Sequence, residues 1–269
     1  MCKTLWSQDA PFNLSCPAGN YSSGHTPAGC VPLALAQINY FWNFPHWYNY
    51  SIMPLNKVDA GGLASNGSQI FEVDFMIRNL GLELATNYND GGSSTDDANI
   101  VPVFNIEQYS SISSTTSEQM QSAVGQDNGT TYSSLLTNEV GTNYRPCIIT
   151  GFSARSYFLG IIPQTSGDGH CWICDGSQVV NAQITYTNTT YTQTSWGWQP
   201  NVWVTSGGTV PEYYLHMNWG LATTNGETGR DGLAASNNAW YECNVNYTQA
   251  NGGTPNFQYF QVVYYNIQP

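Results

Sequence analysis

Residues 29–44, GCVPLALAQINYFWNF, are the most informative stretch of this 269-residue chain. Apolar residues recur there every three or four positions, the spacing of one helix face: Val31, Leu35, Ile38 and Trp42. Pro32 is compatible with the first turn of a helix, where no amide donor is needed, and Pro45 marks the end. The stretch therefore predicts a largely buried helix that begins at Cys30.

Around this helix, the chain divides into a helical first half and a strand-rich second half. We expect a second helix over residues 68–81, capped by Ser68 and ended by Gly81, and a short one over 131–141. Polar, Gly- and Pro-rich stretches predict loops at residues 1–29, 46–67, 85–99 and 110–130. Beyond Tyr144, β-branched and aromatic runs predict strands at 146–152, 169–176, 177–187, 213–219, 239–245 and 257–267.

This order of elements predicts an α+β fold in a single domain spanning residues 1–269. A helix-rich lobe, residues 1–143, would face an antiparallel sheet lobe, residues 144–269. Residues 187–211 resemble an insertion between two of the strands.

Composition excludes several classes of partner. The chain has 6 Lys and Arg against 18 Asp and Glu, a net charge of -12, so neither nucleic acid nor an anionic membrane is expected as a partner. No apolar run is long enough to span a membrane. Only 9% of residues are charged, and a surface polar through Ser, Thr, Asn and Gln suits an exported protein. Residues 1–20 contain no signal peptide, so we expect either a cytosolic protein or a mature form whose export signal is missing.

Seven cysteines are present, so at least one thiol stays unpaired within the chain, and one or two disulfides are possible. Cys171 and Cys174 form a C-x-x-C pair, but no second pair accompanies them. In a strand they would point to opposite faces, so we expect core packing, with no metal site and no cofactor. Cys2 would carry a lipid anchor if a precursor's signal ended just before it.

Cys30 is the candidate nucleophile. It stands at the predicted helix start, where amide groups and the helix dipole stabilise a thiolate and lower its pKa. Gly29 would let a substrate backbone approach the sulfur. The alternative is that Cys30 is one more buried small residue.

His170 is the candidate general base. It lies 140 residues after Cys30, within the range seen in papain-like enzymes, and also at the start of a predicted element. Asn218 and Gln8 are weaker candidates, to orient the imidazole and to complete an oxyanion hole. Each has a plain structural alternative: a strand His, a turn Asn and a solvated Gln.

Taken together, these segments resemble the streptopain family of papain-like cysteine peptidases. The resemblance rests on four motifs in order: WSQDAPFNLSCP at 6–17, AGCVPLALAQI at 28–38, GHCWICDG at 169–176 and HMNWG at 216–220. Residues 76–97 and the closing VVYYNIQP are also similar, so the resemblance covers almost the whole chain.

The resemblance implies a papain-like two-lobed fold with the cleft between a helical and a sheet lobe. It implies Cys30 as nucleophile, His170 as base and acid, and Gln8 as oxyanion donor, with Trp219 and Asn218 packing against and orienting His170. It further implies a secreted or surface-bound bacterial endopeptidase that acts on polypeptides, and a precursor with an inhibitory propeptide. A monomer is expected.

Three departures from the family are visible. LATTNGETG follows HMNWG in place of W-G-G, Pro32 replaces an Ala after the nucleophile, and residues 187–211 are additional. The first of these leaves specificity open. A Cys–His amidase acting on peptidoglycan peptides and a non-enzymatic glycan- or protein-binding module remain the alternatives.

Overall fold

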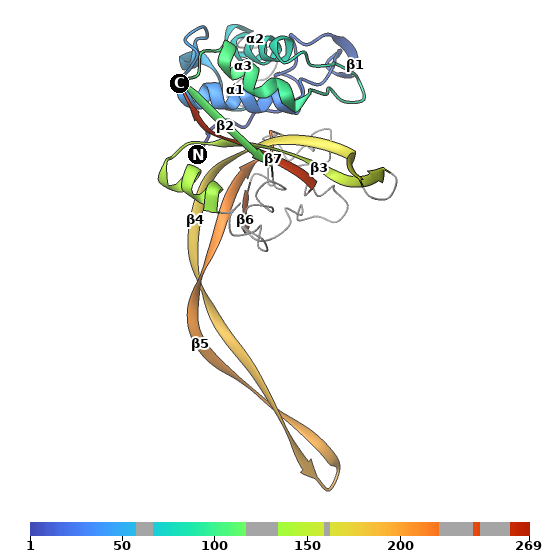
Figure 1. The fold of residues 1–269 in the computed structure, drawn as a ribbon, viewed down its shortest axis with the longest axis vertical. Coiled ribbons are helices and arrows are strands. Elements are labelled where there is room, and N and C mark those ends of the chain that lie inside the picture. Colours follow the sequence, from blue (N-terminus) through green and yellow to red (C-terminus); the bar gives the residue numbers. More distant parts are fainter. Residues whose placement is uncertain (58–66, 117–133, 159–161, 221–238, 243–258) are drawn as a thin grey trace.

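A computed structural model describes residues 1–57, 67–116, 134–158, 162–220, 239–242 and 259–269, and shows helices on one side of a sheet (Figure 1). The α-helices of this part are α1 (Cys30–Trp42), α2 (Gly67–Glu83) and α3 (Ile100–Ile106). Shorter helical turns are η1 (Tyr50–Ile52), η2 (Asp97–Asn99) and the π-helical η3 (Asn138–Thr142). No described helix is long and apolar enough to cross a membrane.

The sheet has the strand order β2-β7-β3-β4-β5-β6, and every neighbouring pair is antiparallel. Its strands are β2 (Ser111–Thr116), β3 (Cys147–Phe158), β4 (Ile162–Thr194), β5 (Gly197–Asn218), β6 (Ala239–Glu242) and β7 (Tyr259–Gln268). A separate strand, β1 (Ala18–Ser22), belongs to the N-terminal segment. The predicted combination of helices with an antiparallel sheet is confirmed.

Helix α1 packs against both α2 and β4 and lies on the side of the helical layer that faces the sheet (Figure 1). Nearly all of it is buried as far as Asn39, in agreement with the sequence pattern. It ends at Asn43, which adopts a left-handed conformation with φ 50° and whose amide reaches back to the last turn. The start of this helix is therefore held in place by packing along most of its length.

The sheet separates two hydrophobic cores. Successive side chains of a strand point to opposite faces. Ile148 and Ile173 accordingly join the core beneath the helices, whereas Ile149 and Trp172 join a smaller core on the other face. This alternation determines which residues of β4 can meet α1.

Strands β4 and β5 continue far beyond the sheet as a two-stranded ribbon (Figure 1). Pairing runs without interruption from Gly176–His216 to Thr194–Gly197, apart from one register shift between Gln183 and Thr185. Residues 187–211, which resembled an insertion, form the outer half of this ribbon.

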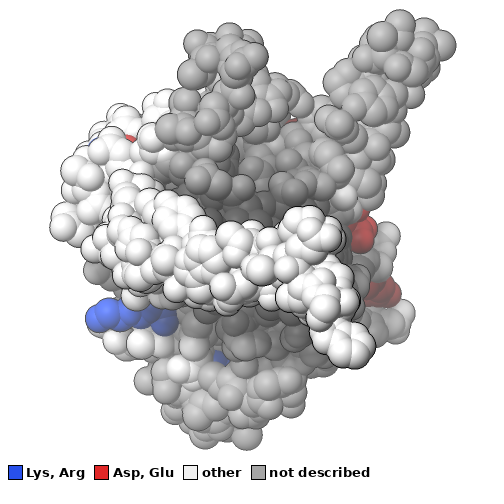
Figure 2. Space-filling model, turned by 90° about the horizontal axis from the view of Figure 1, so that it is seen from below, with Lys and Arg blue, Asp and Glu red and all other residues white. Residues whose placement is uncertain are grey.

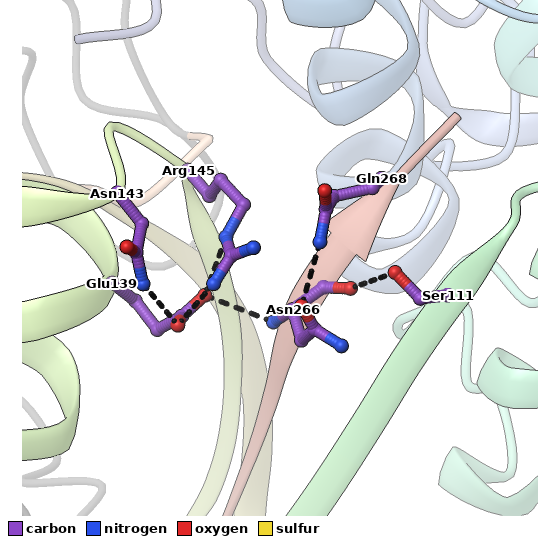
Figure 3. A network of polar contacts seen from close by, with 6 residues as sticks. All are labelled: Ser111, Glu139, Asn143, Arg145, Asn266 and Gln268. Atoms are coloured by element: carbon purple, nitrogen blue, oxygen red, sulfur yellow. Dashed lines mark hydrogen bonds and ion pairs between the residues drawn. The ribbon is translucent and has the colours of Figure 1, made fainter.

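Glu139 joins η3 to the end of β7 (Figure 3). Its carboxylate accepts hydrogen bonds from Asn143 Nδ2 at 2.9 Å, from Arg145 Nε at 2.9 Å and Nη2 at 2.6 Å, and from the amide of Asn266 at 3.0 Å. Burial alone would raise the pKa of Glu139, but these hydrogen bonds outweigh burial and lower it. Ser111 Oγ donates to the Asn266 carbonyl, so the network extends to β2.

A second buried carboxyl lies inside the helical layer. Glu107 is fully buried, and its Oε1 accepts a hydrogen bond from Asn39 Nδ2 at 2.8 Å. Tyr109 donates to Asn39 Oδ1 in turn, while Glu107 Oε2 has no hydrogen-bond partner among the described residues. Burial raises the pKa of Glu107 to about 8, so the folded protein keeps this proton at neutral pH.

We expect Glu107 to make stability fall as the pH rises. An unfolded Glu releases its proton near pH ~4.3, whereas folded Glu107 holds it until about pH 8. Between these values the folded state binds one proton more than the unfolded state. The free energy of unfolding therefore falls by on the order of 3–5 kcal/mol up to pH 8, and Glu107 lowers it no further above that pH. Urea unfolding of the wild type and of Glu107→Gln from pH 4.5 to 8.5 measures this, because glutamine cannot titrate. The variant should lose less stability with rising pH; parallel curves for the two proteins would contradict the assignment.

Several expectations for the elements need correction. Helix α2 begins one residue before Ser68 and runs past Gly81 to Glu83. Loops were predicted over residues 85–99 and 110–130, but η2 and β2 fall within them, and residues 117–133 lie outside the described part. The predicted helix at 131–141 is represented by helical residues 134–137 and by η3. The strand predicted at 239–245 is described only as far as Glu242.

Candidate active site

Cys30 is the first residue of α1, and Gly29 precedes it with φ 92°. This left-handed conformation favours glycine, and a Cβ there would lie 3.3 Å from Pro32 Cδ. The Cys30 side chain is half-buried, and α1 has no acidic residue in its first turn to oppose a negative charge. The helix start can therefore stabilise a thiolate that a substrate can reach.

His170 lies on β4, opposite Gly151 of β3, and is only 5% exposed. Its ring stacks with those of Trp219 and Trp172, at centroid distances of 5.9 and 6.2 Å. Nε2 lies 3.0 Å from the backbone carbonyl oxygen of Trp219. Because a carbonyl only accepts, Nε2 carries the hydrogen, and the lone pair of the neutral ring is on Nδ1.

Cys30 and His170 line the same cavity, of about 170 Å³. It lies where the start of α1 meets β3, β4 and residues 93–97. Besides the two candidates, its wall includes a carboxyl, hydroxyls and an aromatic ring: Asp97, Ser93, Thr95, Thr150 and Phe152. The sequence analysis gave these wall residues no role in the site, although residues 76–97 resembled the family, because they meet only in the folded chain.

Asp97 is the charged group of this wall. Burial raises the pKa of its carboxyl. The neighbouring Cys171 thiol is also buried, and burial raises its pKa well above the usual value. Of the two adjacent cysteines, Cys30 is thus at the helix start, whereas Cys171 lies within the core.

Gln8 is buried in the N-terminal segment. Its backbone carbonyl accepts a hydrogen bond from the Ala28 amide at 3.0 Å, two residues before Cys30. The N-terminal segment is thereby fixed alongside the start of α1. Gln8 is not among the described residues that line the cavity.

Asn218 is almost fully buried and connects the N-terminal segment to the turn at Trp219. Its Nδ2 donates to the Thr4 carbonyl at 2.8 Å, and its Oδ1 accepts from the Gly220 amide at 3.1 Å. These bonds hold the turn at Trp219, whose carbonyl faces His170.

Gly220 brings that turn against α1. It has φ 66°, and a Cβ there would lie 2.7 Å from Leu33 Cδ2. The turn that holds His170 therefore packs directly on the helix that presents Cys30.

Two further motif residues lie apart from this cavity. Asp175 Oδ1 is 2.6 Å from His216 Nδ1, and its Oδ2 accepts from the Cys2 amide at 2.6 Å. His216 also contacts the Trp240 ring edge-on. Asp175 thus connects the N-terminal segment to His216, the histidine of the HMNWG motif.

The cysteines agree with the core-packing expectation. Cys171 joins the core under the helices and Cys174 the core on the other face of the sheet, as strand alternation predicts. The described cysteines, 2, 16, 30, 147, 171 and 174, form no disulfide in the described part, and Cys243 lies outside the described residues. Within the described part, no group of three or more His, Cys, Asp or Glu is placed to hold a metal ion.

Comparison with known proteins was made on both sequence and structure. A model of the Peptidase C10 family matches residues 6–226, a range that includes Gln8, Cys30, His170, Asn218 and Trp219. Active wild-type interpain A, a cysteine protease of Prevotella intermedia, is similar with a TM-score of 0.59 at 15% identity, covering 100% of this chain and 94% of that chain. A prointerpain A fragment from the same organism has a TM-score of 0.53 at 15% identity, covering 100% and 71%. No curated protein matches.

Proposed function

Since the chain belongs to the Peptidase C10 family and is a cysteine peptidase, we propose that it cleaves extended polypeptides with Cys30 as nucleophile and His170 as general base and acid. The observation that supports this assignment is the shared cavity, whose wall includes both residues. They come from opposite halves of the sequence and from different layers of the fold. A nucleophile and a base that meet in one accessible hollow are the minimum that acyl transfer requires.

In the first step, His170 Nδ1 takes the thiol proton of Cys30. The thiolate attacks the scissile carbonyl carbon, and the electron pair of the C=O bond moves onto its oxygen. When the tetrahedral intermediate collapses, the C–N bond breaks and the imidazolium gives its proton to the leaving amine. Water, deprotonated by His170, then hydrolyses the thioester and restores the Cys30 thiol.

Trp219 positions the imidazole for this role. Its carbonyl accepts from Nε2, which keeps the lone pair on Nδ1, and its ring stacks on the histidine. The carbonyl also stabilises the imidazolium that forms after proton transfer. Asn218 contributes by holding the turn that carries this carbonyl.

The amide of Cys30, at the start of α1, is one donor to the oxyanion, and Gln8 is proposed as the second. Gln8→Ala should lower kcat by about 10²–10³-fold, because a neutral donor to the developing charge is lost. The rate of iodoacetamide alkylation of Cys30 should stay nearly unchanged, since alkylation forms no oxyanion. Steady-state kinetics and timed alkylation on the same preparations measure the two effects.

Gln8→Glu is the matched variant, and it should be as damaging as alanine or more so, because it places a negative charge beside the oxyanion. If Gln8→Ala kept wild-type kcat, or if it lost alkylation as well, Gln8 would have a structural role.

The substrate is proposed to bind between a helix-rich lobe, residues 1–143, and a sheet lobe, residues 144–269, of one papain-like domain. By resemblance, a hydrophobic residue is preferred two places before the cut on the acyl side. An apolar pocket distinguishes one methylene by only about 1–3 kcal/mol, so this preference should be broad.

Secretion by a bacterium and synthesis with an inhibitory propeptide are part of the same proposal. Prointerpain A, which this chain resembles in fold, supports the propeptide. The low content of charged residues supports an exported protein.

Digestion of an unfolded protein tests the proposed function. The chain should release peptides in the presence of a reductant and remain active in EDTA, because thiolate chemistry requires no metal. Cleavage of peptidoglycan fragments without cleavage of the unfolded protein would favour the amidase alternative. A peptide library in which a charged residue is required two places before the cut would contradict the proposed specificity.

A further inference from the structure

Residues 2–5 are bonded to both layers of the fold, and the N-terminus lies close to where the helical layer meets the sheet (Figure 1). On the side of the helices, the Leu5 amide donates a hydrogen bond to the carbonyl of Leu55, in the loop after η1, at 2.7 Å. On the side of the sheet, the Cys2 amide donates to Asp175 Oδ2 at 2.6 Å. Residues 2–5 are therefore fixed at both ends.

Thr4 lies in the middle of this stretch and is fully buried. Its carbonyl accepts a hydrogen bond from Asn218 Nδ2 at 2.8 Å and a longer one from Gln37 Nε2 of α1 at 3.5 Å. Asn218 is the last residue of β5, and its Oδ1 accepts from the Gly220 amide at 3.1 Å. The Thr4 carbonyl therefore connects the end of β5 to the helix that begins with Cys30.

The orientation of the His170 ring depends on this connection. The group that accepts from its Nε2 is the backbone carbonyl of Trp219, at 3.0 Å. A backbone carbonyl is oriented only by its own peptide, so the ring depends on the turn that follows β5. Asn218 holds that turn, and the Thr4 carbonyl holds Asn218. A series of hydrogen bonds thus links residues 2–5 to the proposed general base.

Asp175, which binds the start of this stretch, lies at an irregular point of the sheet. Cys174 pairs with Met217 and Gly176 pairs with His216, so Asp175 is the additional residue of a β-bulge in β4. Bulges redirect side chains, and they are frequent next to active sites. This one presents the carboxylate to the chain's first residues.

The buried charge of Asp175 requires hydrogen-bond donors. Other carboxylates of this chain reach the surface, where water satisfies them, as the red atoms in Figure 2 show. The side chain of Asp175 is 0% exposed. Burial of a carboxylate is costly unless hydrogen bonds satisfy it. Its two oxygens bond to the Cys2 amide and to His216 Nδ1, each at 2.6 Å. The charge therefore favours docking of residues 2–5 on β4.

We propose that Asp175 is a positioning residue for catalysis and that it acts through residues 2–5. With these residues docked, the Thr4 carbonyl holds Asn218, which in turn keeps the Trp219 carbonyl against the imidazole. Release from Asp175 would loosen the turn and misalign the ring, which lowers the rate of the chemical step more than the affinity for substrate. The inference rests on the proposed role of His170 as general base.

Asp175→Ala tests the proposal, because it removes the acceptor of the Cys2 amide. It should lower kcat by up to about 10²-fold with little change in KM, since misplacing a reacting group by about 1 Å can cost this much. The pH profile of Cys30 alkylation should shift upward, as in His170→Ala but by less. The matched control is His216→Asn, whose side-chain amide can still donate to Asp175. The control should keep the wild-type kcat and alkylation profile.

Deletion of residues 2–5 distinguishes an action through this stretch from a general loosening of the sheet. The deletion should lower kcat and shift the alkylation profile at least as much as Asp175→Ala. Asp175→Ala in the deleted chain should add no further change, because the two alterations interrupt the same series of contacts. Near-ultraviolet circular dichroism checks that each variant is folded.

Effects of the two alterations that add, or a His216→Asn enzyme as impaired as Asp175→Ala, would overturn the proposal. The deletion carries the test alone if Asp175→Ala does not fold, and a deleted chain with the wild-type kcat would overturn it. An unchanged alkylation profile in Asp175→Ala beside a shifted one in His170→Ala would overturn this inference alone. An unchanged profile in His170→Ala would overturn the proposed base itself.

Discussion

Cys30→Ala should abolish peptide hydrolysis and leave the protein folded. Alanine cannot form the acyl-enzyme. In a serine peptidase, which also uses a nucleophile activated by a histidine base, loss of the nucleophile lowers kcat by on the order of 10⁶-fold. The Cys30 side chain lies half-exposed at the cavity wall, so alanine there removes little buried volume and the fold should persist. Release of peptides from an unfolded protein substrate, followed by mass spectrometry, measures the loss.

Cys171→Ala is the matched control for this prediction. Cys171 also lines the cavity, but its side chain is buried and burial raises its pKa well above the usual value, so it remains protonated. This variant should retain most of the activity. Activity that survives Cys30→Ala but not Cys171→Ala would move the nucleophile to Cys171.

His170→Ala should reduce kcat by several orders of magnitude, through loss of the base that generates the thiolate and of the acid that protonates the amine. It should also shift the pH profile of Cys30 alkylation upward, since the thiolate would then be stabilised by the helix start alone. The pH dependence of the alkylation rate separates this role from a purely structural one. Loss of activity with an unchanged alkylation profile would contradict a role for His170 in thiolate formation.

His170 also stacks with Trp172 and Trp219 and bonds to the Trp219 carbonyl, so alanine at this position removes structural contacts as well as the base. His170→Gln is the control, because its amide can still donate to the Trp219 carbonyl but cannot act as a base. It should be as inactive as His170→Ala while unfolding closer to the wild type in a thermal melt. An active His170→Gln enzyme would exclude His170 as the base.

The parts of the fold that the sequence predicted are those with strong local patterns. Helix α1 has apolar residues at helical spacing and a proline in its first turn, and its buried face is as expected. The alternation that places Cys171 and Cys174 in different cores is equally local. The family resemblance rested on four short motifs, and the C10 match over residues 6–226 confirms it.

What the sequence did not reveal depends on contacts between distant segments. Asp97 and Phe152 join the cavity only because the loop before α3 and strand β3 meet there. The Trp219 carbonyl as partner of His170 could not be predicted, since a backbone oxygen leaves no signature in the sequence. The ribbon did have a signal, because Thr alternates with other residues at 185–189 and at 190–194, and Val at 202–204, but its extension beyond the sheet arises from the long β4–β5 register.

The most direct test of the central claim is alkylation with one equivalent of iodoacetamide, followed by peptide mapping. Burial raises the pKa of Cys16 to about 12, and those of Cys2 and Cys171 well above the usual value, so these thiols should react slowly at neutral pH. The account predicts that a single label maps to Cys30 and that hydrolysis stops in proportion to labelling. An inactivated sample with Cys30 unmodified and the label on Cys171 or Cys174 would contradict it.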